Sequence, residues 1–326
     1  MWARFRPDPF VVGLLLTVGI ASVLPARGWA APVVAFVADA AIVFLFFLHG
    51  AKLSRAAIVR GVTHWRLHLT VLAMTFAVFP LLGLALAALP AIDPDLATGV
   101  LFLSAAPSTV QSSVAFTAIA GGNVAGAVCA AALSNLLGVV VTPLLVTALI
   151  GGDGGAHVSG AAAVTIALQL VAPFAIGHAM RPWIGTWIEG RKRLVSYADR
   201  GAILMVVYAA FGAAVVEGLW QRTGPGEIAL ILGLSVVLLL VVLVISWVGS
   251  GWLGFAREDR IVVQFCGSKK SLAAGVPIAG VLFPAATVGF IILPLMVFHQ
   301  VQLIACAWLA RRYASRMSPP PAQKAD

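Results

Sequence analysis

Ten apolar stretches, most of them long enough to cross a bilayer, run through this 326-residue chain and limit what it can fold into. A helix needs about 20 apolar residues to cross the hydrocarbon core. Hydrophobic residues make up 61% of the chain and charged ones 10%, which excludes a soluble enzyme, a disordered protein and a fibrous protein. We therefore expect an all-α polytopic membrane protein with ten transmembrane helices. The predicted spans are 9–26, 32–52, 67–90, 96–120, 124–150, 161–181, 198–219, 226–253, 259–283 and 286–310.

The positive charges fall mostly on one side of the predicted membrane. The formal net charge is +9, and 17 of the 21 lysines and arginines lie in segments on the same side as the N-terminus, against two on the other side. Positive residues are enriched on the cytoplasmic side, so both termini are expected in the cytoplasm, with the protein in a plasma (inner) membrane. The basic surface then meets anionic membrane lipid, and no nucleic acid is needed to explain it. The other two charges, Lys269 and Lys270, fall inside a span.

A single transmembrane domain is expected over residues 1–326, because no segment between spans could hold a second domain. A Gly-rich loop divides it into a first repeat at 1–150 and a second at 151–315, and 316–326 is predicted to be a disordered tail. Five spans in each half is an odd number, so two similar halves would have opposite orientations in the membrane. The N-terminus also imitates a secretory signal, and whether its span is retained stays open.

Two predicted spans are interrupted near the middle by polar and helix-breaking residues, at 107–113 and at 267–271. Interrupted helices at corresponding places in opposed halves indicate the binding site of a transporter, although an ordinary proline-kinked helix is the alternative for the first. The freed backbone groups need partners, so both interruptions should lie inside the protein and meet. The candidate substrate- and ion-binding residues are Ser108, Thr109, Gln111, Ser112, Ser113, Asn135, Ser268, Lys269, Lys270 and Ser271.

Two adjacent lysines inside a span are costly, at about 2.5–3.5 kcal/mol each on insertion scales. Lys269 and Lys270 could neutralise an anionic substrate, take the place of a bound cation, or form a structural clasp with helix-end carbonyls and the hydroxyls of span four. A buried lysine can also lose its proton, so proton coupling is a further alternative. Asp39, His49 and His299 are candidates for the wall of a substrate cavity.

Several segments resemble the bile acid:sodium symporter family, most closely the branch related to the divergent seventh member of the mammalian solute carrier family. These segments are 46–53, 104–113, 122–125 and 265–273. The resemblance covers essentially the whole chain and implies two inverted five-helix repeats in which broken helices four and nine cross. It also implies that panel helices at 9–52 and 161–219 move against core helices at 67–150 and 226–310, with substrate bound between them.

The sodium site of that family matches this sequence only in part. Ser112 and Ser113 occupy the places of a Ser-Asn pair, so sodium near them is one alternative. Hard cations need oxygen ligands with negative charge nearby. Two implied hydroxyl ligands fall on Ala127 and Ala131, the implied acidic ligand falls on or beside Phe265, and the implied amide falls on Lys269, so most of the oxygen ligands are replaced.

We therefore expect a secondary active transporter that moves an organic anion by alternating access, with Lys269 or Lys270 as a built-in cation. No enzyme motif such as a P-loop or HExxH occurs in the sequence, so neither enzymatic activity nor a cofactor is expected, and sodium or a proton is the candidate coupling ion. Two alternatives stay open, a non-transporting membrane sensor or regulator and a cation/proton antiporter. The substrate and the oligomeric state do not follow from the sequence.

Overall fold

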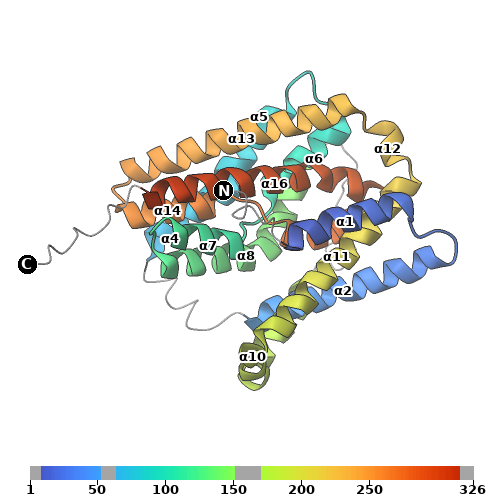
Figure 1. The fold of residues 1–326 in the computed structure, drawn as a ribbon, viewed down its shortest axis with the longest axis horizontal. Coiled ribbons are helices and arrows are strands. Elements are labelled where there is room, and N and C mark those ends of the chain that lie inside the picture. The colour runs from blue at the N-terminus through green and yellow to red at the C-terminus, as the bar shows by residue number, and fades with distance from the viewer. Residues whose placement is uncertain (1–8, 53–63, 151–169, 316–326) are drawn as a thin grey trace, which may run out of the picture.

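The computed structural model describes residues 9–52, 64–150 and 170–315, which are all helical apart from short connections (Figure 1). The predicted tail at 316–326, the first eight residues and the start of the predicted span 161–181 lie outside the described residues. The elements are α1 (Pro9–Val23), α2 (Ala30–Lys52), α4 (Trp65–Ala73), η2 (Met74–Val78), α5 (Phe79–Ala87), α6 (Pro94–Ala105), α7 (Gln111–Ile119), α8 (Val124–Ile150), α10 (Ala172–Gly190), α11 (Lys192–Val216), α12 (Leu219–Arg222), α13 (Pro225–Trp252), α14 (Arg257–Gly267), α15 (Leu272–Leu282) and α16 (Ala285–Ser315).

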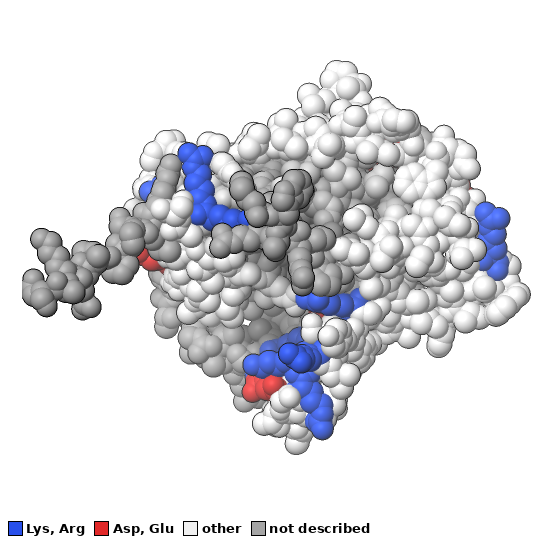
Figure 2. Space-filling view, viewed as in Figure 1, with Lys and Arg blue, Asp and Glu red and all other residues white. Residues whose placement is uncertain are grey.

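The described residues contain six helices that are long and apolar enough to cross a membrane: Ala30–Lys52, Trp65–Ala87, Val124–Ile150, Lys192–Val216, Pro225–Trp252 and Ala285–Ser315. The surface agrees, because few charged side chains interrupt the face in Figure 2, and large apolar side chains such as Leu144, Leu240 and Ile304 are exposed. The predicted all-α fold is thus confirmed for the described residues, and their six long apolar helices agree with a membrane protein. The ten-span inverted repeat stays a prediction, since only six helices of the described residues meet the length and composition of a membrane span, whereas spans 96–120 and 259–283 are each built from two shorter helices, as the interruptions predict.

Helices α1, α2, α10 and α11 pack against one another at one side of the molecule (Figure 1). The backbones of α2 and α10 touch directly at two glycines. A Cβ atom on Gly50 would collide with the carbonyl of Phe174, and one on Gly177 would collide with the carbonyl of Phe47. This four-helix group meets the other helices largely through α11, which packs along α16 and α15. These are the helices predicted as the panel, and the division into panel and core stays a prediction.

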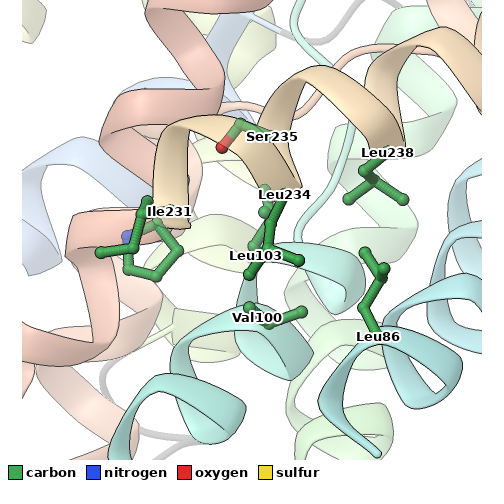
Figure 3. A pocket seen from close by; sticks show the side chains of 8 residues that line it. Leu86, Val100, Leu103, Ile231, Leu234, Ser235 and Leu238 are labelled. Atoms are coloured by element: carbon green, nitrogen blue, oxygen red, sulfur yellow. The ribbon is translucent and has the colours of Figure 1, made fainter. Parts of the chain in front are cut away.

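The long helix α13 closes the opposite side by packing on α16 and α14, and its side chains also meet α5 and α6. Figure 3 shows the seam, where Leu234 and Leu238 of α13 face Leu86 and Leu103. The crevice left between them has a volume of about 10 Å³, which is room for one water molecule at most. The seam is therefore close-packed, and the polar interior lies elsewhere.

Candidate functional site

Two interruptions in the helices define the polar interior. The predicted span 96–120 consists of α6 and α7, joined by residues 106–110, and the predicted span 259–283 consists of α14 and α15, joined by residues 268–271. Pro107 follows directly after α6 because a proline in the helix would remove a hydrogen bond and clash with the preceding turn. The first interruption is shorter than the sequence suggests, since Gln111, Ser112 and Ser113 form the first turn of α7.

The backbone of the first interruption is held by polar side chains of α8. The N–H of Ser108 donates to the hydroxyl of Ser134 at 3.0 Å, and its carbonyl accepts from the Asn135 amide at 2.7 Å. The carbonyl of Ala105, at the end of α6, accepts from the Thr142 hydroxyl at 2.9 Å. Groups that a broken helix leaves unpaired are costly in a bilayer, and here the protein itself satisfies them.

The second interruption lies directly against the first. The N–H of Ser271 donates to the carbonyl of Pro107 at 2.7 Å, which joins the two interruptions. The hydroxyl of Ser271 caps α15 by accepting from the N–H of Ala274 at 3.2 Å. Ser268 is buried at the end of α14, where its N–H continues the helix by donating to the Gln264 carbonyl. The meeting of the two interruptions that the sequence predicts is therefore present.

Hydroxyl groups of the first interruption and of α7 bind the end of α14. The hydroxyl of Ser108 donates to the carbonyl of Cys266, and that of Ser113 donates to the carbonyl of Phe265 at 3.0 Å. These two carbonyls lie in the last turn of α14, where helical partners run out. The hydroxyl of Thr109 lies 2.8 Å from those of Ser112 and Ser113.

Lys270 places its ammonium group in a cage of main-chain carbonyls. Its Nζ donates to the carbonyls of Thr75 at 2.8 Å, Ser104 at 2.6 Å and Ala106 at 2.7 Å. The side chain is fully buried, and Nζ also lies 4.2 Å from the centroid of the Phe79 ring. All three ammonium protons therefore have an acceptor. These hydrogen bonds offset the free-energy cost of burying the charge, and only a cation can make all three of them.

The three carbonyls are available because of two irregularities in the helices. Thr75 lies in the π-helix η2, where each N–H bonds the carbonyl five residues earlier. The residue five positions after Thr75 is Pro80, which has no N–H, so the Thr75 carbonyl lacks a helical partner. Ser104 and Ala106 lie at the end of α6, where the last carbonyls also lack helical partners.

Gln302 of α16 holds the peptide of Lys270 from the other side. Its Oε1 accepts from the N–H of Lys270 at 2.8 Å, and its Nε2 donates to the carbonyl of Lys270 at 2.8 Å. The same Nε2 lies 2.8 Å from Nδ1 of His299, which places that predicted cavity residue beside the interruption. The Gln302 amide thus replaces the two backbone partners that Lys270 lost when the helix was interrupted.

The Gln302→Ala variant is expected to lose about 2–6 kcal/mol of stability, because two buried backbone groups of Lys270 would lose their Gln302 partner at about 1–3 kcal/mol each. The matched control is Gln300→Ala in the same helix, since Nε2 of Gln300 has no hydrogen-bond partner in the described structure. Thermal unfolding of the purified variants in detergent measures the difference. Equal losses of stability in both variants would show that the two hydrogen bonds from Gln302 to the Lys270 peptide do not stabilise the protein.

Lys269 points away from Lys270 into a different cluster. Its Nζ lies 4.0 Å from the centroid of the Phe116 ring and 5.3 Å from that of Phe265. Both lysine side chains are fully buried. The structure therefore does not bring the two ammonium groups into one cavity.

The remaining predicted residues lie outside this network. Gln111 faces the four-helix group, where its Oε1 lies 3.4 Å from a guanidinium nitrogen of Arg200 in α11. His49 lies 3.6 Å from the Asp199 carboxylate, and Asp39 is exposed on α2. Sequence reasoning missed several groups of the site, and only the spacing from Thr75 to Pro80 could have indicated one of them. The missed residues are Thr75, Ser134, Thr142 and Arg200.

Comparison with known proteins decides the family. A model of the SBF-like CPA transporter family matches residues 8–315. The chain belongs to this family. It is 53% identical over 318 residues to the uncharacterized protein PA2026 of Pseudomonas aeruginosa, covering 96% of this chain and 95% of that one. It is 49% identical over 308 residues to "Putative symporter YfeH" of Escherichia coli, with 94% and 92% covered.

More distant members of the family are animal proteins. The chain is 27% identical over 314 residues to sodium/bile acid cotransporter 7 of Rattus norvegicus, covering 92% of this chain and 91% of that one. The predicted resemblance to bile acid:sodium symporters is therefore confirmed. The family and the relatives from Escherichia coli and Rattus norvegicus carry transporter names, in agreement with a membrane transport protein and not an enzyme.

The residues at the implied sodium positions do not fit a sodium ion. Ala127 and Ala131 are fully buried and present only methyl groups, and the position implied for an acidic ligand falls on or beside Phe265, whose ring is also fully buried. Sodium is a hard cation that needs several oxygen ligands and nearby negative charge. The carbonyls of Ser104 and Ala106 at the start of the interruption already bind the Lys270 ammonium. No step of the proposed function is therefore assigned to sodium.

Proposed function

We propose that this protein is a secondary active transporter that moves an organic anion across the plasma (inner) membrane by alternating access. The observation that carries the proposal is the contact between two interrupted helices, in which Lys270 of one interruption binds free carbonyls at the other. Interrupted helices with their backbone satisfied inside the protein are a hallmark of transporter binding sites. The bile acid named for the animal relatives is an organic anion, which supports this class of substrate.

The moving parts are the four-helix group, as the panel, and the remaining helices, as the core. The substrate binds between them beside α7, where Ser112 and Gln111 lie at the start of the helix. The hydrogen bond from Arg200 to Gln111 joins the two parts in this conformation, and it breaks when they move. The 17 positive charges on one predicted side support an orientation with both termini in the cytoplasm.

Lys270 acts in this scheme as a tethered cation. A free cation would neutralise the helix-end carbonyls only while bound, whereas the Lys270 ammonium is covalently attached and stays. The positive charge at the crossing is therefore present in every step of the cycle. We infer that transport does not require sodium.

Uptake by purified protein in liposomes tests the proposal. A thermal-shift screen of bile acids, keto acids, sulfonates and sterol conjugates selects the anion, and its labelled form is then offered to proteoliposomes and to protein-free liposomes. We expect protein-dependent uptake that changes less than about twofold when choline replaces sodium. A steep dependence on sodium concentration would refute the tethered-cation scheme. Stabilisation by an anion without uptake would favour a sensor, and cation-driven proton movement without an organic anion would favour an antiporter.

A further inference from the structure

Lys269 is a buried lysine whose surroundings differ from those of its neighbour. In the described part of the chain its Nζ has no hydrogen-bond acceptor, whereas Nζ of Lys270 has three. The neighbours of Lys269 are instead the faces of two aromatic rings, Phe116 of α7 and Phe265 of α14. Each lysine is 0% exposed, so water does not screen this difference.

Two opposing effects act on the charge of Lys269. Burying an ammonium group without an acceptor disfavours its charged form. An aromatic face attracts a cation, and two faces therefore favour the charged form. Burial brings the free energies of the charged and neutral forms closer together than they are in water, and the aromatic faces keep the charged form accessible. A group in this situation can exchange a proton.

The same reasoning gives the opposite result for Lys270. A neutral amine has only two N–H groups and could not donate to the carbonyls of Thr75, Ser104 and Ala106 at once. Losing the proton would leave at least one of these buried carbonyls unpaired, so the site holds Lys270 in its charged form. Adjacent lysines on one interruption thus have different tasks.

We propose that Lys269 is the site at which this transporter binds and releases a coupling proton, while Lys270 stays charged. This inference rests on the proposed function, because only a transporter needs a coupling ion. In the release step a Nζ–H bond of Lys269 breaks, its electron pair stays on nitrogen, and the proton passes to water on the side to which the site is open. Rebinding from the other side reverses the step.

The groups around Lys269 do not compete for this proton as strong acids or bases. The titratable groups that face it are the thiols of Cys266 in α14 and Cys306 in α16, and α7 contributes the Phe116 ring. Within the described residues no carboxylate lies at ion-pair distance from Nζ of Lys269. Lys270 is the nearest group of like charge along the chain. Lys269 lies on the same interruption as Ser271, whose N–H donates to the carbonyl of Pro107. A change of charge at Lys269 therefore acts on the segment where the two interruptions meet.

Isotope labelling of the lysine side chains reports whether Lys269 binds and releases a proton. The chain has only five lysines, so protein carrying ¹³C at lysine Cε gives five side-chain signals, which Lys→Arg variants assign. In detergent, over the pH range in which the protein stays folded, we expect the Lys269 signal to titrate and the Lys270 signal to stay constant. A constant Lys269 signal, or titration of Lys270 instead, overturns the inference without touching the proposed function.

Transport adds an independent readout. Proteoliposomes are given the anion selected by the thermal-shift screen and a pH gradient of one unit. Wild type and the control Lys192→Gln, changed at an exposed residue at the start of α11, should accumulate the anion in response to the gradient. In Lys269→Gln, the accumulation of the anion in response to the gradient should be at least tenfold lower than in the wild type. An undiminished response in Lys269→Gln overturns the inference, and no uptake by the wild type overturns the proposed function and the coupling with it.

Discussion

Replacing Lys270 with methionine is expected to lower the unfolding temperature of the purified protein by about 10 °C or more, or to prevent its accumulation in the membrane. The methionine side chain has a similar length and no donor, so three buried carbonyls would lose their partner. An unpaired buried group costs about 1–3 kcal/mol, and the three together about 3–9 kcal/mol. A loss of this size corresponds to roughly ten degrees in a chain of several hundred residues. Thermal unfolding in detergent, followed by intrinsic fluorescence, measures it.

The neighbouring lysine provides the matched control. Lys269→Met removes a charge of the same type from the adjacent position, but no hydrogen bond of the described structure is lost. We expect its unfolding temperature to stay within about 3 °C of the wild type. Lys270→Arg should fall between the two, because a planar guanidinium keeps the charge but does not fit three carbonyls grouped around one point. Equal destabilisation by the two methionine variants would show that burial of charge, and not the carbonyl cage, governs stability.

The second large effect is expected at the crossing of α2 and α10. Gly50→Ala and Gly177→Ala each place a methyl group on the backbone of the other helix, which cannot yield as a flexible side chain can. Overpacking of this kind costs about 1–3 kcal/mol. Because both substitutions force the same pair of helices apart, the double variant should lose less than the sum of the single losses.

Gly201→Ala in α11 is the control for these two variants, since a Cβ atom there would meet nothing within 4 Å. Alanine favours a helix over glycine by up to about 1 kcal/mol, so this variant should be neutral or slightly stabilised. Thermal unfolding of all four variants gives the comparison. Additive losses at Gly50 and Gly177 would mean that the two contacts are independent.

The sequence predicts the interruptions well because their causes are local. Pro107 ends a helix by its own chemistry, and the serines and lysines after Gly267 have no place in a regular span. The extent of the first interruption is predicted less well. Ser112 and Ser113 favour an unwound segment by composition, yet both lie in the first turn of α7, where the N–H groups have no helical carbonyl to bond and polar residues are well tolerated.

The partners of the lysines could not be predicted, because they are mostly main-chain atoms. A carbonyl carries no side-chain signature, and those that bind Lys270 belong to residues 164 to 195 positions away. The π-turn that frees the Thr75 carbonyl follows from Pro80 only when the helix register is already known. Gln300 and Gln302 look alike in the sequence, and only the orientation of α16 shows that the second one holds Lys270.

The carbonyl cage also sets an order of events for synthesis in the cell. The carbonyl of Ala106 is made 164 residues before the lysine that binds it. A ribosome adds about 5–20 residues per second, so the Ala106 carbonyl waits roughly 8–33 s for its partner. During that time the N-terminal half has an incomplete interior, and its free carbonyls must be hydrated or held by the insertion machinery. Arrival of a single side chain from the C-terminal half then joins two helices of the N-terminal half, α6 and the helix that contains η2.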